Sequence, residues 1–419
     1  MSNKELNTYM HDFIKEICKD IGPRESGTEA EILTGNRIED EMKKFCDTTQ
    51  QEEYISSPTA FLGGVRYGAL LILISIILYW LSLLIDLDIL PLSNIYSTIF
   101  LLIDVILITL TVSYFILEVM RYHEAFDFLF PKKASKNVIG VIEPTKEQKN
   151  SIIFSAHHDS AYEFNIFYYL KRFGQLTIFV GYLGVVILFI IVILKLILNI
   201  FSIYARTLFF IFGIVFLCLI PIVIAYIFFH SYNSVLGAFD NLSGVAIVLG
   251  IGRILSENKT QNKFIPKHTK VYLISFAGEE AGLRGAKRYL KKHYEELKKE
   301  NTKLVNMDGI SQPDNIAFLK SEPLIGAKHS EEIYTELAHV AEDLDLEAGI
   351  TILPFGATDA AAFSKKNLPA TSICGLNLVD ELVGYYHTRN DTPDVVNPEA
   401  LGVVVDICIE YLKRIDSTK

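Results

Sequence analysis

The hydrophobic positions of this chain gather in four long blocks, which polar or charged segments separate. The blocks cover about residues 67–85, 95–117, 176–198 and 207–229. Each approaches the roughly 20 apolar residues that an α-helix needs to cross a hydrocarbon core of about 30 Å. We therefore predict four transmembrane helices, arranged as two hairpins over residues 61–122 and 173–230.

The remaining segments alternate between strand-like and helix-like patterns. Short apolar runs typical of buried strands occur at residues 137–142, 151–156, 270–276, 303–307 and 315–319. Runs with helical character lie between them, among them 242–256, 281–299 and 398–414. This alternation predicts an α/β fold, with a mostly parallel central sheet and helices on both faces. We expect a discontinuous soluble domain formed by residues 1–60, 123–172 and 231–419, into which the two hairpins are inserted.

Charge predicts the orientation of the hairpins. Both hairpins return the chain to the side it left, where seven Lys or Arg residues lie near the span ends; Lys195 and Arg206 are the two near the connecting loops. The positive-inside rule therefore places the soluble domain in the cytoplasm. The polar start, MSNKELNTYMHDF, lacks the apolar region of a secretory signal and agrees with that side.

Asp104 lies in the middle of the second block, where an ionised carboxylate is costly. A role in an ion or proton path is one interpretation. We favour a hydrogen bond in helix packing, because we identify no second charge in the spans near it.

Composition excludes several classes of function. The formal net charge is −10, and no Lys/Arg-rich tract extends beyond a helix face, so nucleic acid is not an expected partner. The five cysteines are scattered and form no C-x-x-C pair, which argues against a disulfide framework or a thiolate zinc site. The four apolar blocks make the lipid bilayer an expected partner.

Five short strings at strand ends or turns carry side chains of metal-ligand types. They are SAHHDS, GAFDNLSG, SFAGEEAG, LVNMDG and GYYHTRNDTPD, and they contain His157, Asp159, Asp240, Glu279, Glu280, Asp308, His387 and Asp391. Each string alone has an ordinary structural interpretation, and Asp240 in particular is placed to cap the helix that follows it. Two divalent metals about 3.5–4 Å apart, however, need a bridging carboxylate, further imidazole or carboxylate ligands and a place for water. Two His, two Asp and one Glu supply that set and leave one Glu as a base.

In this order, the five strings resemble the M28 family of dizinc aminopeptidases. The pattern of that family is H-x-D, D-N-x-S-G, E-E, a strand ending in Asp, and Y-H-T-x-x-D-T. The opening GPRESGTEAE also resembles the GPR-x-SG segment of the family, and TDAAAF at Asp359 loosely matches its S-D-H-x-x-F, with Ala360 where a His is common. The resemblance covers about residues 1–56, 125–170 and 231–419.

The resemblance implies a role for each matching residue. Asp240 would bridge two zinc ions, with His157 and Asp308 on one ion and Glu280 and His387 on the other. Glu279 would be the general base. Tyr386 would stabilise the oxyanion. Asp159 and Asp391 would orient the metal ligands without binding the metal themselves.

Two features depart from the family pattern. A membrane hairpin separates H-x-D from the bridging Asp, which follows shortly in soluble members. The middle position of H-x-D is His158, which we interpret as a structural residue and not as an additional ligand.

These patterns together predict a membrane-anchored dizinc aminopeptidase that hydrolyses short peptides with a metal-bridging water and a Glu base. The alternatives are an inactive peptidase-like receptor domain, a single-zinc acyltransferase of the glutaminyl cyclase kind, and a four-span transporter. Every matching position is filled, which argues against the inactive domain. Zinc stoichiometry separates the peptidase from the acyltransferase.

Overall fold

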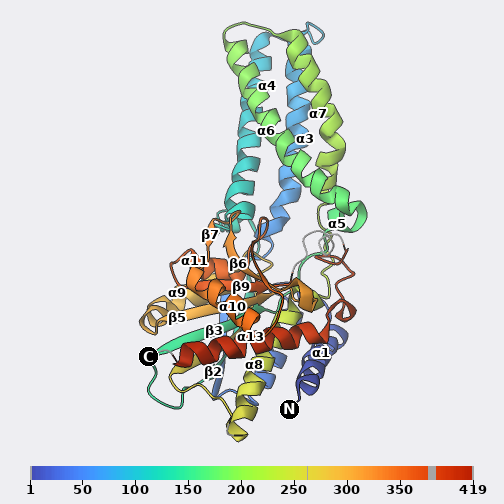
Figure 1. Ribbon diagram of the computed structural model, residues 1–419. Coiled ribbons are helices and arrows are strands. Elements are labelled where there is room, and N and C mark those ends of the chain that lie inside the picture. Colours follow the sequence, from blue (N-terminus) through green and yellow to red (C-terminus); the bar gives the residue numbers. More distant parts are fainter. Residues whose placement is uncertain (1, 262, 376–383, 418–419) are drawn as a thin grey trace. The chain divides into compact units, whose positions relative to one another are not determined.

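The computed structural model describes residues 2–261, 263–375 and 384–417, and it divides into two compact units. Unit 1 comprises Met1–Pro58, Asp127–Glu163 and Tyr232–Lys419. Unit 2 comprises Thr59–Phe126 and Phe164–Ser231, so it consists of two insertions into the sequence of unit 1. Figure 1 shows the chain coloured along its sequence.

Unit 1 is built on a nine-stranded sheet with the order β1-β2-β4-β3-β5-β9-β6-β7, to which β8 is added beside β6. The strands are β1 (Thr48–Ser56), β2 (Lys133–Ile142), β3 (Asn150–His157), β4 (Thr269–Phe276), β5 (Thr302–Asp308), β6 (Ala317–Glu322), β7 (Ala327–Lys328), β8 (Gly349–Ile352) and β9 (Ala370–Cys374). The four central strands, β4, β3, β5 and β9, are parallel. On one side β1 and β2 pair antiparallel with their neighbours; on the other β6 pairs antiparallel with β9 and β7 and parallel with β8. The predicted parallel sheet therefore describes the centre, and the edges are mixed.

Helices cover both faces of this sheet. They are α1 (Asn3–Asp20), α2 (Glu29–Met42), α8 (Ser243–Thr260), α9 (Arg284–Lys299), α10 (Glu331–Asp343), α11 (Asp359–Ser364) and α13 (Pro398–Ser417). One hydrophobic cluster joins α1, α8, α10 and α13 to the sheet, and a second joins α9 and α11 to it. The predicted α/β fold with helices on both faces is thereby confirmed.

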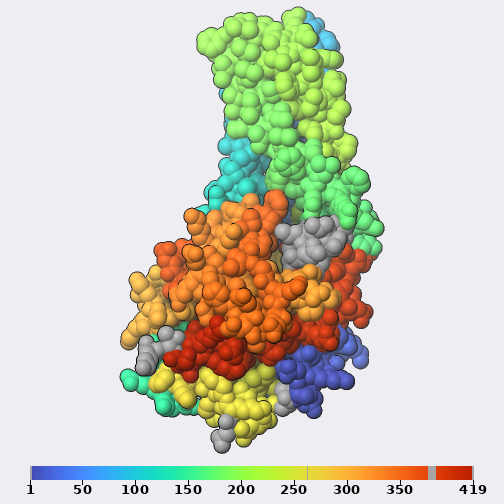
Figure 2. Space-filling model, viewed as in Figure 1, coloured from blue at the N-terminus to red at the C-terminus, as the bar shows by residue number. Residues whose placement is uncertain are grey.

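Unit 2 contains four long helices and one short one. They are α3 (Ala60–Asp86), α4 (Asn94–Tyr114), which a π-helical segment (Phe115–Met120) extends, α5 (Asn165–Leu170), α6 (Arg172–Ile200) and α7 (Arg206–Ile227). Their buried side chains form one apolar cluster, while large apolar residues such as Ile77, Ile106 and Ile211 remain more than half exposed. The green atoms in Figure 2 show α6 and α7 covering the visible side of this unit.

Within the described residues, five helices are long and apolar enough to cross a membrane, one more than the four predicted. The fifth covers Ala238–Thr260 and belongs to unit 1, where 89% of its apolar stretch is buried within the protein. Its composition is that of a helix surrounded by core, since a helix that is apolar on all sides is buried in protein or in a membrane. The other four are the helices of unit 2.

The interior of unit 2 is more polar than we expected. Asp86 and Lys195 are buried and form an ion pair, and the ammonium also donates to Ser82 Oγ at 2.7 Å. Asn199 Nδ2 donates to Ser97 Oγ at 2.8 Å. The expectation of a single buried charge is therefore wrong. Lys195 is also not a loop charge, because its partner is inside the unit.

Asp104 is fully buried, and the hydrogen bond predicted for it is not formed. Ser75 lies beside it, but neither carboxylate oxygen meets a hydrogen-bond partner among the described residues. The side chain therefore occupies a dry position between packed helices.

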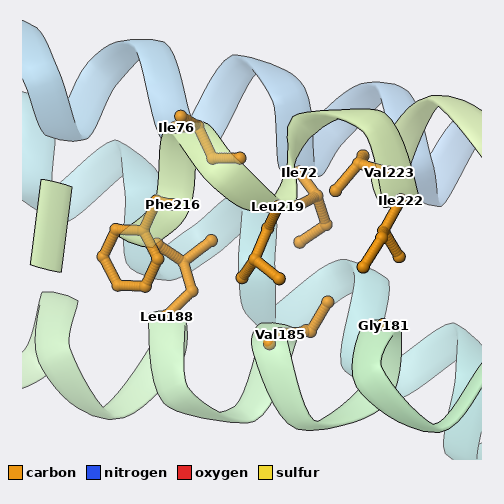
Figure 3. Close-up of a pocket in the computed structure, with 10 residues that line it drawn as sticks. Ile72, Ile76, Gly181, Val185, Leu188, Phe216, Leu219, Ile222 and Val223 are labelled. Carbon is orange, nitrogen blue, oxygen red and sulfur yellow. The ribbon is translucent and has the colours of Figure 1, made fainter. Parts of the chain in front are cut away.

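A small cavity of about 20 Å³ lies between α3, α6 and α7 (Figure 3). Its walls are aliphatic side chains, Phe216 and two glycines, Gly181 and Gly184. The lining side chains offer no polar partner for a water or a polar ligand, so the cavity is a gap in packing.

Candidate metal centre

The candidate centre lies where the carboxyl ends of the parallel strands meet. His157 is the last residue of β3 and Asp308 the last of β5, and two residues separate the end of β4 from the Glu279–Glu280 pair. Because β3 lies between β4 and β5 in the sheet, the three chain segments leave the same edge side by side. This register brings residues together that are up to 151 positions apart, from His157 to Asp308.

The segment that carries Asp240 departs from regular helix geometry. Asp240 (φ −117°, ψ 90°) and Asn241 (φ −142°, ψ 43°) lie immediately before α8, and the peptide between them is cis. Asn241 Oδ1 accepts from the Gly244 N–H at 3.0 Å, and Asn241 Nδ2 donates to Met307 O at 2.9 Å. The side chain that bonds a free N–H at the start of α8 is thus Asn241, which leaves the Asp240 carboxylate for other contacts.

Gly244 is required by the close approach of this turn to β5. A Cβ atom at this position would lie 2.5 Å from both Asn241 Oδ1 and Met307 O. Only glycine fits such a contact. The D-N-x-S-G string therefore encodes the docking of the turn against the strand that ends in Asp308.

The two carboxylate oxygens of Asp240 face two different imidazoles. Oδ1 lies 3.2 Å from His157 Nε2, and Oδ2 lies 3.1 Å from His387 Nε2. Around this axis, Glu280 Oε1 is 3.1 Å from His387 Nε2, while Asp308 Oδ1 and Glu279 Oε2 are each 3.8 Å from His157 Nε2. All six predicted ligand and base residues thus converge on one point.

Two more predicted carboxylates hold the backbone of this cluster. Asp159 accepts from the N–H groups of Glu279 and Glu280, each at 3.1 Å, and its own carbonyl lies 3.2 Å from His157 Nδ1. Asp391 accepts from the N–H groups of Phe239 at 2.6 Å and Asp240 at 3.2 Å. Each buried carboxylate therefore orients a loop that carries residues of the cluster.

Tyr386 and His158 lie beside the cluster with different contacts. The half-buried Tyr386 ring stacks on His387 with 3.9 Å between ring centroids. Its predicted contact with an oxyanion stays a prediction. His158 instead forms a hydrogen bond with Ser275 Oγ at 2.9 Å, and burial lowers its pKa to about 4. A neutral imidazole bonded away from the cluster agrees with a structural role.

Sequence analysis missed three arginines that frame the cluster. Arg24, in the GPR string, is fully buried and donates to the carbonyls of His158, Leu236 and Gly237. Arg284 and Arg389 pair with Asp127 and Glu163. The GPR string was the available signal for Arg24, whereas the partners of the other two are 157 and 226 positions away in the chain.

The electrostatics of the cluster fit the binding of cations. Burial raises the pKa of Glu279 well above its ordinary value and raises the pKa of Asp308 to about 6. Burial also acts on His387, but the neighbouring Glu280 and Asp240 carboxylates outweigh it and raise the pKa to about 10. Four carboxylates share two imidazoles in a site shielded from water. Three groups of side chains each bring their ligand atoms within 4.8 Å of one another, a spacing that suits a divalent metal. The groups are His157–Asp240–Asp308, His157–Glu279–Glu280 and Asp240–Glu280–His387.

Comparison with solved structures identifies the fold. The zinc aminopeptidase BSAP of Bacillus subtilis aligns with a TM-score of 0.54 and 14% identity, over 99% of this chain and 96% of that chain. An aminopeptidase of Aneurinibacillus aligns with a TM-score of 0.52 and 15% identity, over 99% and 96%. A Zn-dependent exopeptidase of Parabacteroides distasonis aligns with a TM-score of 0.54 and 14% identity, over 98% and 97%. The α/β unit thus has the fold of a zinc exopeptidase.

A family model matches part of the sequence. Residues 224–412 match the model of peptidase family M28, so this part of the chain is similar to that family. The matched range contains Asp240, the Glu279–Glu280 pair, Asp308 and His387, and His157 lies outside it. A search of curated proteins gave no significant match. The resemblance inferred from the five strings is confirmed.

Proposed function

We propose that this protein is a membrane-anchored aminopeptidase that removes amino-terminal residues from short peptides with the help of two zinc ions. Because residues 224–412 match family M28 and the chain has the fold of zinc exopeptidases, it is a zinc metallopeptidase. The observation that carries the finer proposal is the placement of Asp240 between His157 and His387, with one carboxylate oxygen near each imidazole.

The residues around Asp240 fall into two sets of ligands. Asp240 would bridge both zinc ions, with His157 and Asp308 completing one set and Glu280 and His387 the other. In each set the carboxylate lies near the imidazole of the same set: Asp308 faces His157, and Glu280 faces His387. When bound, zinc supplies Lewis acidity, which favours a nucleophilic hydroxide near neutral pH and polarises a carbonyl.

Glu279 is the proposed general base. It belongs to neither set, its carboxylate lies at the centre near His157, and burial raises its pKa, so it can accept and release a proton. In hydrolysis, Glu279 takes a proton from the attacking water and passes it to the leaving amine. Asp159 fixes the Glu279 backbone during this transfer. Tyr386, beside His387, is proposed to donate its hydroxyl to the developing oxyanion.

The four long helices of unit 2 are proposed to span the membrane as two hairpins, with unit 1 as a discontinuous catalytic domain on the cytoplasmic side. Two observations support a membrane anchor: the length and apolar composition of these helices, and the apolar side chains that unit 2 exposes. Because Lys195 pairs with Asp86 inside unit 2, it no longer counts among the charges near the connecting loops. The excess of Lys and Arg on the side of unit 1 is therefore larger than the sequence count indicated. Protease treatment of sealed vesicles tests the side, because only a domain outside the vesicle is digested.

A mixed peptide library tests the reaction. Detergent-purified protein is incubated with the library and zinc, with Glu279→Ala as the control, and the products are read by mass spectrometry. Loss of residues from the amino end by the native protein alone supports the proposal. Cleavage from the carboxyl end, or no cleavage with any divalent metal, contradicts it and favours the binding-domain alternative.

Zinc content separates the remaining alternative. Two zinc ions per chain, measured by elemental analysis of the purified protein, agree with a peptidase of this design. One ion per chain together with cyclisation of an amino-terminal glutamine would favour the acyltransferase.

A further inference from the structure

The residues of unit 1 that border the two insertions share one feature. Asp127 is the first residue of unit 1 after the first insertion, and Glu163 is the last residue before the second. Each carboxylate pairs with an arginine of unit 1, Asp127 with Arg284 and Glu163 with Arg389. Arg284 begins α9 directly after the turn that carries Glu279 and Glu280, and Arg389 lies in the loop that carries His387.

The first pair joins Asp127 to the turn after β4. Arg284 NH1 and NH2 donate to the two oxygens of Asp127 at 2.5 and 2.7 Å, a bidentate contact that fixes the guanidinium plane. Arg284 Nε also donates to Ala281 O at 2.7 Å, and the Arg284 N–H donates to Gly278 O at 2.8 Å. The turn of residues 278–284, which carries Glu279 and Glu280, is thus closed on itself and tied to Asp127.

The second pair joins Glu163 to the loop that carries His387. Arg389 Nε and NH2 donate to the two oxygens of Glu163 at 2.6 and 2.9 Å, and the Arg389 N–H donates to Oε1 at 3.2 Å. Glu163 is 2% exposed, so these donors balance a buried carboxylate. Arg389 lies midway between His387 and Asp391, and the contact therefore fixes the backbone of both.

We propose that Asp127–Arg284 and Glu163–Arg389 are positioning pairs, through which the border residues of the two membrane insertions hold the Glu279–Glu280 turn and the His387 loop in place. The inference rests on the proposed function for the roles of those loops. Bidentate contacts restrict both distance and direction, whereas an exposed pair such as Arg37–Glu16 fixes little. The placement of a base and of ligands within a fraction of an ångström decides turnover.

The test uses isosteric changes on the border side of each pair, Asp127→Asn and Glu163→Gln, in the full chain. The matched control is Asp343→Asn, which removes the charge from a carboxylate that pairs with Arg414. Hydrogen exchange is measured first, on metal-free protein, for peptides that cover residues 278–284 and 385–391. We expect Asp127→Asn to speed exchange only in the first peptide and Glu163→Gln only in the second, each by about tenfold.

Zinc retention and kinetics form the second part. Both variants should lose zinc to a chelator faster than the control does, and kcat should fall by about tenfold with KM within about twofold, since substrate groups are not removed. Arg389→Lys, at a half-exposed position, keeps the charge without the fork and should give an intermediate loss. Equal exchange and zinc retention in the three carboxylate variants would overturn the inference. A native protein without peptidase activity contradicts the proposed function alone, because exchange still decides the pairs.

Discussion

Both units bury charge, but they balance it in different ways. In unit 1, Asp240, Glu279, Glu280 and Asp308 converge on two imidazoles. In unit 2, the Asp86 carboxylate meets the Lys195 ammonium, and Ser82, Ser97 and Asn199 satisfy polar atoms around the pair. The first cluster has more carboxylates than its own side chains neutralise, whereas the second is neutral as a whole. An excess of one charge, rather than burial alone, distinguishes the proposed metal centre.

The two clusters also differ in their roles: the ion pair of unit 2 links two helices, whereas the carboxylates of unit 1 are placed to bind a cation. The unit 2 pair joins α3 to α6 through residues 109 positions apart, and each charge in it has a partner of opposite sign. Burial raises the pKa values of Glu279 and Glu280, and neighbouring carboxylates raise them further, so these groups gain from a cation. Substitutions should therefore change metal content and activity in one unit and only stability in the other.

The largest effect is expected for Asp240→Ala. Asp240 contacts both imidazoles, so its loss removes a ligand from both proposed metal positions at once. Elemental analysis should show near-complete loss of zinc, and peptidase activity should fall to background. Two zinc ions in the purified variant would contradict the bridging role.

Glu279→Ala should separate metal binding from chemistry. The ligands remain, so zinc content should stay at the native level, while loss of the general base should lower kcat by about 10²–10⁴-fold. Steady-state kinetics with the peptide that the library selects provide the measurement. Native turnover in the zinc-loaded variant would assign the base elsewhere.

Lys195→Met should act on stability and leave the metal centre intact. It leaves Asp86 buried without its ammonium partner, a change that costs about 3–5 kcal/mol for buried ion pairs. Thermal unfolding in detergent gives the loss. The double variant Asp86→Leu/Lys195→Met should regain most of it, because no charge is left unpaired. A fall in zinc content of the folded variant would break the proposed separation between the units.

The sequence predicted best what local patterns determine. Apolar block length gave the four helices of unit 2, and the five strings gave every residue that converges on Asp240. The polar edge strand β1, TTQQEEYIS, was missed because most of its side chains are exposed or half-exposed and carry no apolar alternation. The apolar helix α8 resembled a span because the core surrounds it.

Contacts between distant residues were beyond local patterns. From the sequence, Lys195 was counted as a loop charge, whereas in the fold it pairs with Asp86 of α3. Likewise, no residue near Asp127 or Glu163 in the chain indicates their arginine partners. Such pairs depend on which strands and helices become neighbours, so they emerge only with the fold. The proposed metal ligands could be found from the sequence because each lies in a string that is informative by itself.

The smallest effect is expected for Asp104→Asn. Asp104 is buried and lacks both an ammonium partner and a hydrogen bond among the described residues, so a neutral amide of the same shape should be tolerated. We expect unfolding to change by less than about 1 kcal/mol, with zinc content and kcat unchanged. Thermal unfolding and peptide hydrolysis, measured beside Lys195→Met, provide the check. Loss of peptidase activity without loss of stability would instead reveal that this buried carboxyl of unit 2 takes part in function, and charge excess would no longer be sufficient to find the functional site.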